Sequence, residues 1–243
     1  MSVKTFFGFK EVDETAKQNL VGQVFSSVAS KYDVMNDFMS FGLHRLWKRD
    51  MIAKIAPHQG MKYLDVAGGS GDIGFKVAAR GADVTLTDIN ADMLQQAKRK
   101  ALDRGKVQGI RYKVEDAEKL SFADASFDAV GISFGIRNVT HIDVALREFY
   151  RVLKAGGKFV CLEFSNVDNE YLRKAYDAYS FNIIPKLGGI VAGDEASYQY
   201  LVESIRKFPP ADEFENMIKS AGFSGTGYKK LTFGTVAIHW GVK

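Results

Sequence analysis

Apolar residues along this chain follow two patterns, and their alternation predicts the fold. Short apolar runs, typical of buried strands, occupy residues 62–66, 82–88, 109–116, 127–133 and 158–164. Elsewhere apolar residues recur every three or four positions, as on one face of a helix, at residues 14–30, 43–56, 72–80, 169–183, 194–207 and 210–221. Strands that alternate with helices indicate an α/β fold, a doubly wound and mostly parallel sheet.

Capping and turn residues place two further helices and a hairpin. Asn90 precedes a helix whose apolar face comprises Met93, Leu94, Ala97 and Ala101. Thr140 precedes another helix, which Gly156 and Gly157 are expected to end. The closing sequence YKKLTFGTVAIHWGVK has two β-rich runs that meet at Gly234, which predicts a terminal antiparallel hairpin and seven strands in all.

The composition narrows the class of protein without assigning a function. Hydrophobic residues make up 46% of the 243 residues and charged residues 26%, as in ordinary globular domains. No apolar run approaches the ~20 residues of a membrane span, and the N-terminus lacks the apolar centre of a signal peptide. Cys161 is the only cysteine, so we expect a cytoplasmic protein with no disulfide and no metal. The net charge of +4 tolerates an anionic membrane surface, but no ladder of basic and aromatic residues indicates nucleic-acid binding.

A glycine-rich loop after the first of these strands indicates a nucleotide-like ligand. The sequence LDVAGGSGDIG (64–74) contains the dinucleotide fingerprint G-x-G-x-x-G, from Gly69 to Gly74. Asp88 ends the next strand, 20 residues after Gly68, where an acid binds a ribose diol. An NAD-dependent enzyme is therefore one alternative.

Acidic residues around this loop favour a different cofactor. Asp65 and Asp72 flank the glycines and would repel a pyrophosphate, whereas S-adenosylmethionine carries an ammonium and a sulfonium and no phosphate. We expect Asp65 to face the amino-acid end of this cofactor and Asp88 to accept both ribose hydroxyls. Asp116 and Ala117, at the end of the third strand, would then lie beside the adenine, because open α/β sheets bind ligands at the carboxyl ends of their strands.

The fourth strand ends in SFGIRNV (133–139), which puts a charge and an amide where an apolar strand stops. Four other segments accompany it: KYDVMNDFMSFGLHRLWK (31–48), LEFS (162–165), KAYDAYSF (174–181) and YQYLVESIRKFP (198–209). Together they resemble the ubiquinone/menaquinone biosynthesis C-methyltransferase family, which belongs to the class I S-adenosylmethionine-dependent methyltransferases. The resemblance covers nearly the whole chain; Ser70 and Ala155 stand where threonine and proline are usual.

The resemblance implies a reaction and a set of site residues. The reaction would be methylation of a ring carbon of a polyprenylated benzoquinol or a demethylmenaquinol, and Tyr32, Arg137 and Asn138 would face this quinol. With the residues of the glycine loop, the expected cofactor-binding set is Asp65, Gly69, Ser70, Gly71, Asp88, Ile89, Asp116, Ala117 and Ser133.

We expect a single methyltransferase domain in four parts. These are an N-terminal helical cap (1–57), a cofactor-binding core (58–165), a substrate lid (166–210), and a C-terminal helix and hairpin (211–243). The lid sequence is rich in aromatic and aliphatic residues, as a prenylated substrate requires, and Gly188 and Gly189 are expected to make it flexible.

The chemistry assigns tasks to the acceptor-side residues. A ring carbon becomes a nucleophile when a neighbouring hydroxyl loses its proton, so the site must stabilise an oxyanion. Arg137 and Asn138 can donate hydrogen bonds to it, and Tyr32 can hydrogen-bond or stack on the ring. Arginine is a poor general base because its pKa exceeds about 12. The acceptor of the ring proton is left open between a water molecule and the side chains of Asp33, Asp37, His44, His141 and Glu163.

Two alternative functions also stay open. One is an O- or N-methyltransferase of another small molecule, and the other is a catalytically silent methyltransferase-fold subunit that scaffolds a biosynthetic complex. SFGI replaces the NPPY-type tetrapeptide of amine methyltransferases, which disfavours exocyclic amines as acceptors. The sequence does not distinguish ubiquinone from menaquinone precursors, and it leaves open a homodimer, a quinone-biosynthesis complex and peripheral contact with a membrane.

Overall fold

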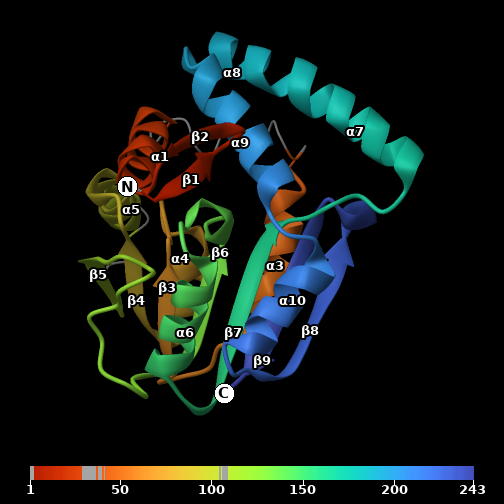
Figure 1. Ribbon diagram of the computed structural model, residues 1–243. Coiled ribbons are helices and arrows are strands. Elements are labelled where there is room, and N and C mark those ends of the chain that lie inside the picture. Colours follow the sequence, from red (N-terminus) through yellow and green to blue (C-terminus); the bar gives the residue numbers. More distant parts are fainter. Residues whose placement is uncertain (1–2, 29–36, 38–39, 41, 104, 106–108) are drawn as a thin grey trace.

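A seven-stranded sheet forms the centre of the molecule. The computed structural model describes residues 3–28, 37, 40, 42–103, 105 and 109–243. The strand order is β5-β4-β3-β6-β7-β9-β8 (Figure 1), and only the pairings of β9 with β7 and β8 are antiparallel. The strands are β3 (Lys62–Val66), β4 (Asp83–Asp88), β5 (Ile110–Val114), β6 (Phe127–Ser133), β7 (Leu153–Phe164), β8 (Ser224–Leu231) and β9 (Val236–Val242). The predicted doubly wound sheet and terminal hairpin are therefore confirmed.

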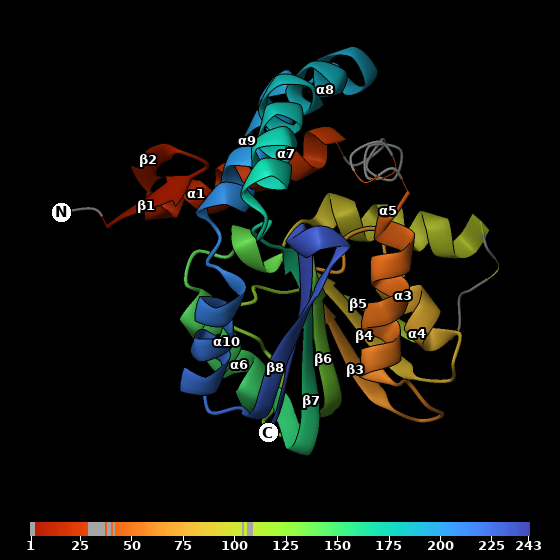
Figure 2. The ribbon, with the colours of Figure 1, turned by 90° about the vertical axis from the view of Figure 1, so that its right-hand side faces the viewer.

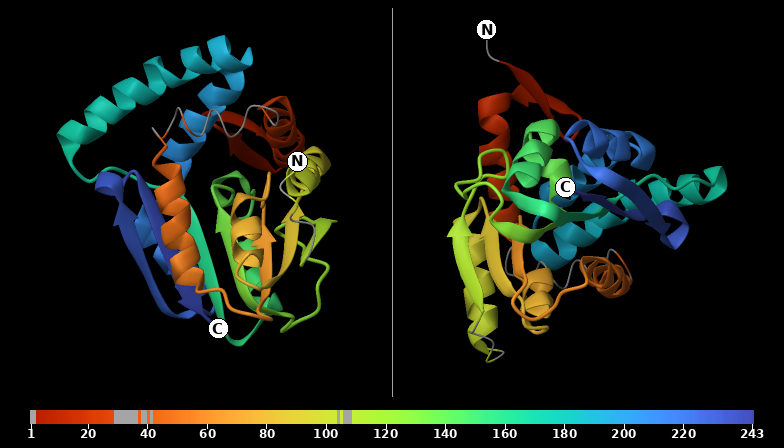
Figure 3. Two further views of the ribbon diagram at one scale, coloured as in Figure 1. Left: turned by 180° about the vertical axis from the view of Figure 1, so that it is seen from behind. Right: turned by 90° about the horizontal axis from the view of Figure 1, so that it is seen from below.

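Helices cover both faces of this sheet. On one face lie α3 (His44–Ile55), α4 (Asp72–Ala78) and α5 (Ala91–Asp103), and on the other lie α6 (Ile142–Val152) and α10 (Ala211–Ser220) (Figure 2). From behind, α3 and α4 are seen in front of the sheet (Figure 3, left). Each face carries its own apolar core, with Met51 and Phe75 fully covered on the first and Phe149 and Phe214 on the second. Because both faces are buried, the central strands are continuous apolar runs, as the sequence showed.

The sequence predicted the start of α5 correctly, but it was wrong about both ends of α6. Asn90 caps α5, since its Oδ1 accepts hydrogen bonds from the backbone N–H of Asp92 (2.9 Å) and Met93 (3.3 Å). Thr140 does not cap α6; the Glu118 carboxylate instead accepts the backbone N–H of Thr140 at 2.9 Å. A second correction is that α6 ends at Val152, before the glycines. Gly156 and its neighbour pair with the last residue of the chain instead, and both lie within β7.

The N-terminal segment is only partly helical. A hairpin of β1 (Lys4–Phe7) and β2 (Lys10–Asp13) precedes α1 (Glu14–Val28), which corrects the expectation of a purely helical cap. Each strand has four residues without clear alternation of apolar and polar positions, so no pattern predicted them. Residues 29 and 30 of the predicted helix lie outside the described part of the chain.

Three helices lie over the carboxyl ends of the parallel strands, far from the C-terminus of the chain (Figure 1). They are α7 (Glu170–Asn182), α8 (Ile184–Ala192) and α9 (Glu195–Lys207). Gly188 and Gly189 lie inside α8, and a Cβ on Gly188 would stand 2.1 Å from a ring carbon of Tyr198 on α9. The first glycine therefore permits close helix packing, which replaces the expected flexible link. No helix among the described residues is both long and apolar enough to cross a membrane.

Candidate functional site

A cleft lies at the carboxyl ends of β3, β4 and β6, with α1 as one wall. It brings together seven residues singled out from the sequence: Gly69, Asp88, Ile89, Asp116, Ala117, Ser133 and Asn138. From α1 come Gln18, Val21, Gly22 and Phe25, which no sequence signal marked as functional. The cleft therefore joins the predicted strand-end residues to a helix far away in the sequence.

The backbone at two strand ends opens the cleft. Ala67, after β3, has φ = 48°, and Phe134, after β6, has φ = 55°, a region that residues with a side chain rarely adopt. Phe134 turns the chain out of the sheet into the 3₁₀ helix η2 (Ile136–Asn138). Gly69, with φ = 55°, brings bare backbone to the floor of the cleft. Non-glycine residues in this conformation often mark functional sites.

Asp88 has the geometry of a diol acceptor. Its Oδ2 accepts the backbone N–H of Gly69 and its Oδ1 that of Asn90, both at 2.9 Å. Burial raises the pKa of Asp88 to about 6, although these backbone donors favour the charged form. Each carboxylate oxygen has lone pairs beyond the one used by the backbone, so the group can accept two hydroxyls.

Asp116 links the cleft to α1. Gln18 Nε2 donates to Asp116 Oδ2 at 2.8 Å, and the Lys17 ammonium donates to the carbonyl of Val139 at 3.3 Å. A further contact runs from Asn90 Nδ2 to the carbonyl of Gly22, at 3.0 Å. These polar contacts hold α1 against the ends of the strands.

The structure places Asp65 behind the glycine loop, outside the cleft. Its side chain is enclosed, and its Oδ2 lies 2.9 Å from where a Cβ on Gly74 would stand. Burial raises the pKa of Asp65 to about 7, against hydrogen bonds from the Gly74 backbone and the Tyr63 hydroxyl that favour the charged form. Asp65 therefore does not line the cleft, and its contact with the amino-acid end of a cofactor stays a prediction.

Ser70 and Gly71 also do not line the cleft, and Ser70 lies beside a cluster of charges. Asp72 is ion-paired with Lys48 (2.7 Å) and Lys100 (3.2 Å), and Lys100 donates to Ser70 Oγ at 3.1 Å. Burial would raise the pKa of Asp72, but the two lysines hold it well below its usual value. Because these cations neutralise Asp72, its repulsion of a pyrophosphate is weaker than the sequence indicated.

Two buried polar groups in the cleft lack a partner in the described part of the chain. They are Ser133 Oγ and Asn138 Nδ2. The other end of the Asn138 amide is engaged, since its Oδ1 accepts the Tyr200 hydroxyl at 2.9 Å. Buried polar groups are nearly always hydrogen-bonded, and a ligand or a water molecule in the cleft can supply the missing partner of these two atoms.

Arg137 points to the other side of η2. Its guanidinium is 3% exposed, and Nη1 donates to Glu163 Oε1 at 2.8 Å and to the carbonyl of Phe134 at 2.6 Å. Its Nε is 3.4 Å from Ser204 Oγ. Arg137 lines a neighbouring pocket beneath β1, beside Lys17 and Tyr200, and the two pockets adjoin at Val139 and Thr140.

The candidate acceptors of the ring proton that the structure describes pair with other side chains and do not line the cleft. Tyr32 and Asp33 lie outside the described residues. His44 and Asp37 bond to each other at 2.8 Å, and burial lowers the pKa of His44. His141 lies between Glu118 and Glu14, at 2.6 Å and 2.5 Å, and the hydrogen bond with Glu118 raises its pKa.

Glu163 is fully buried against Arg137 and the backbone N–H of Phe164. Burial raises its pKa, and Arg137 opposes that rise. Of the four described candidates, none lines the cleft. Sequence reasoning missed Glu118, which does line it and also holds the start of α6. In the described segments, no three or more His, Cys, Asp or Glu side chains are grouped so as to hold a metal ion.

Comparison with known proteins shows which family this chain resembles in sequence. The sequence model of the ubiE/COQ5 methyltransferase family matches residues 12–243. The ubiquinone/menaquinone biosynthesis C-methyltransferase UbiE of Rickettsia akari (strain Hartford) is 54% identical over 98% of this chain and 98% of its own. The mitochondrial 2-methoxy-6-polyprenyl-1,4-benzoquinol methylase of Oryza sativa subsp. japonica is 52% identical over 98% of this chain and 88% of its own.

The fold itself is shared more widely. A crystal structure of Haemonchus contortus phosphoethanolamine N-methyltransferase 2 in complex with S-adenosyl-L-methionine matches with a TM-score of 0.62. The two sequences are 18% identical, and the match covers 81% of this chain and 52% of the other. At this identity the likeness concerns the fold alone.

Proposed function

This chain belongs to the ubiE/COQ5 methyltransferase family, and from that premise we propose that it methylates a ring carbon of a polyprenylated benzoquinol or a demethylmenaquinol. The observation that carries the proposal is the identity of 54% to a quinone-biosynthesis C-methyltransferase along almost the whole of both chains. S-adenosylmethionine supplies the methyl group as an electrophile on a cationic sulfur. The cleft offers separate groups for each of the two substrates.

The cofactor side fits a nucleoside with a free ribose diol. Asp88 presents carboxylate oxygens at the end of β4, and Gly69 leaves bare backbone beside them. Ile89 and Ala117 offer apolar contact for an adenine, and Asp116 can accept from its amino group. Ser133 Oγ, which has no partner in the described structure, is the remaining donor on this side.

On the acceptor side, we assign the oxyanion of the quinol to Asn138. Its Nδ2 is buried in the cleft without a partner among the described side chains, so a phenolate oxygen can accept its hydrogen bond. Arg137 lies behind η2, where Glu163 balances its charge, so a direct contact between Arg137 and the quinol stays a prediction from the family resemblance. Arginine holds its proton, and none of the four described candidate acceptors lines the cleft, so we assign the ring proton to water. Tyr32 stays a prediction from the family resemblance.

We also propose that residues 166–210 cover the substrate and that this edge of the molecule contacts a membrane. Three apolar side chains are largely exposed there: Tyr171 (83%) on α7, Ile190 (81%) on α8 and Phe233 (76%) in the β8–β9 turn. A polyprenylated substrate resides in a bilayer, and exposed apolar groups at its entrance would dock there. Cosedimentation with anionic vesicles should fall when Tyr171 and Ile190 are changed to Ser; unchanged binding would contradict this.

The function is tested with the purified protein and isotopically labelled S-adenosylmethionine. It is incubated separately with a demethylmenaquinol and a demethylated ubiquinol precursor, and the products are located by NMR. We expect label on a ring carbon, with Asp88→Ala inactive and the exposed Asp103→Ala as active as the parent. Label on oxygen or nitrogen would favour the alternative enzyme. Absence of cofactor binding by calorimetry would favour the silent scaffold.

A further inference from the structure

We infer that Tyr200 is a positioning residue for methyl transfer, because its hydroxyl fixes the Asn138 amide with Nδ2 toward the cleft. This inference rests on the proposed function of the cleft. Tyr200 lies on α9, outside the sheet and 62 residues after Asn138, and its hydroxyl donates to Asn138 Oδ1 at 2.9 Å. It lies in the segment 198–209 that contributes to the family resemblance, but the sequence assigned no role to it.

The direction of the amide decides what the cleft presents to an oxyanion. An asparagine side chain has an acceptor oxygen on one arm and a donor nitrogen on the other, and the two arms have nearly the same size. Since Tyr200 occupies Oδ1, Nδ2 is the arm left for a ligand; Asn138 lines the cleft, and Nδ2 is buried with no other partner within the described residues. If the amide rotated by half a turn, Oδ1 would face the phenolate oxygen and repel it.

The surroundings of Tyr200 fix the position of its hydroxyl and keep the hydroxyl protonated, so that it can donate a hydrogen bond. The residue is 5% exposed, and its ring stacks on Phe7 of β1 with centroids 4.0 Å apart and planes 13° apart. Burial raises the pKa of Tyr200 to about 12; the nearby Arg137 opposes this rise and Glu163 adds to it. The hydroxyl is therefore protonated at every pH at which the protein would work.

Tyr200 connects three parts of the chain at the acceptor side. It belongs to the helices that we propose to cover the substrate, it stacks on the N-terminal hairpin, and it bonds to η2 after β6. A correct amide direction therefore depends on α9 being docked. The amide donor would face the cleft only once the cover is in place.

The test is the variant Tyr200→Phe, which keeps the ring and its stacking on Phe7 and removes only the hydroxyl. We expect kcat with the quinol to fall about tenfold to a hundredfold, the loss typical of a hydrogen bond that serves a charged group. The dissociation constant for S-adenosylmethionine should stay within about twofold of the parent value. Tyr228→Phe, which removes a hydroxyl from the edge strand β8 and touches neither pocket, is the control and should leave kcat unchanged.

A second comparison separates positioning from a structural role. On an Asn138→Ala background, Tyr200→Phe should cause no further loss, because the amide that it orients is absent. An equal loss in both backgrounds, or a kcat of Tyr200→Phe within twofold of the parent, would overturn the role of Tyr200 and leave the proposed function standing. A parent protein that methylates neither quinol would overturn both.

Discussion

Replacing Glu163 by Gln isolates the buried charge of Arg137. The two side chains are 0% and 3% exposed and meet at 2.8 Å. Glutamine keeps the size of the side chain and its Oε1 acceptor for the backbone N–H of Phe164. The only large change is the loss of the negative charge opposite the guanidinium, and no other described acid pairs with it.

The expected cost follows from this burial. Removing one partner of a buried ion pair typically costs about 3–5 kcal/mol, because the remaining charge stays out of water without compensation. For a chain of this length each kcal/mol lowers Tm by about 2–4 °C, so Tm should fall by roughly 6–20 °C. If Arg137 is also changed, to Met, most of this loss should be recovered, since two uncharged side chains then fill the same space.

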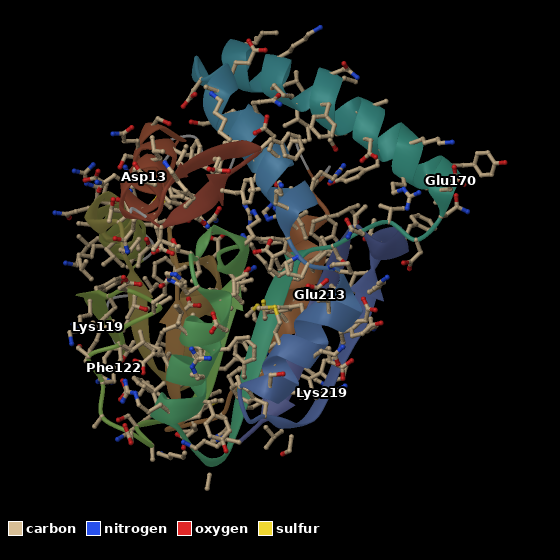
Figure 4. The ribbon with its side chains drawn as sticks, in the orientation of Figure 1. Asp13, Lys119, Phe122, Glu170, Glu213 and Lys219 are labelled. Atoms are coloured by element: carbon tan, nitrogen blue, oxygen red, sulfur yellow. The ribbon has the colours of Figure 1, made fainter. Side chains whose placement is uncertain are left out.

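Urea titration and thermal melting followed by circular dichroism measure both variants. The matched control is Glu170→Gln, at the first turn of α7 (Figure 4), where Glu170 pairs with Lys174 and the side chains are 62% and 72% exposed. An exposed i,i+4 pair contributes about 0.3–0.5 kcal/mol, so the control should melt close to the parent. A Glu163→Gln variant within about 1 kcal/mol of the parent would refute the reasoning, because Arg137 would then be solvated.

Two further predictions concern a buried acid and a helix contact. Asp65 has a pKa of about 7 in the folded protein and 3.8 as its ordinary value, so the folded state is penalised progressively from pH 4 to 7 and fully above pH 7. Asp65→Asn should therefore gain about 2–3 kcal/mol more stability over the parent at pH 8 than at pH 5; an equal gain at both pH values would contradict the buried charge. Gly188→Ala should lower stability by about 1–3 kcal/mol and speed proteolysis of α8, because its Cβ meets Tyr198. Gly189→Ala, whose Cβ would be 3.6 Å from its nearest neighbour, should be neutral or stabilising, and equal melting of the two variants would count against the packing described.

The sequence predicted the strands of the central sheet but not the N-terminal hairpin or helix α8, and the difference has a physical reason. Strands buried on both faces must be apolar throughout, and this left a clear pattern for every strand from β3 to β7 and for the final hairpin. The strands of the N-terminal hairpin have four residues each, too few for a period to show. Helix α8 was missed because Gly188 and Gly189 are typical of a loop, and only the ring of Tyr198 shows why glycine is needed there.

The candidate site was predictable where it depends on topology and not where it depends on side-chain pairing. Asp88 and Ser133 could be placed because parallel strands end at a common edge. The pairing of Asp72 with Lys48 and Lys100 joins residues 24 and 28 positions apart, and nothing in the chain's periodicity marks it. The same is true of Arg137, whose partner Glu163 lies 26 residues away on the neighbouring strand.

The contacts of α1 also bear on the order in which the molecule assembles. Gln18 and Lys17 bond to groups that lie 98 and 122 residues later in the chain. Contacts with such long separations form late in folding, because a large loop must close first. We therefore expect this wall of the cleft to be among the last parts to form, although its residues are synthesised early. A ligand that fills the cleft stabilises only the completed fold, so we expect cofactor supply to influence how much newly made chain reaches the native state.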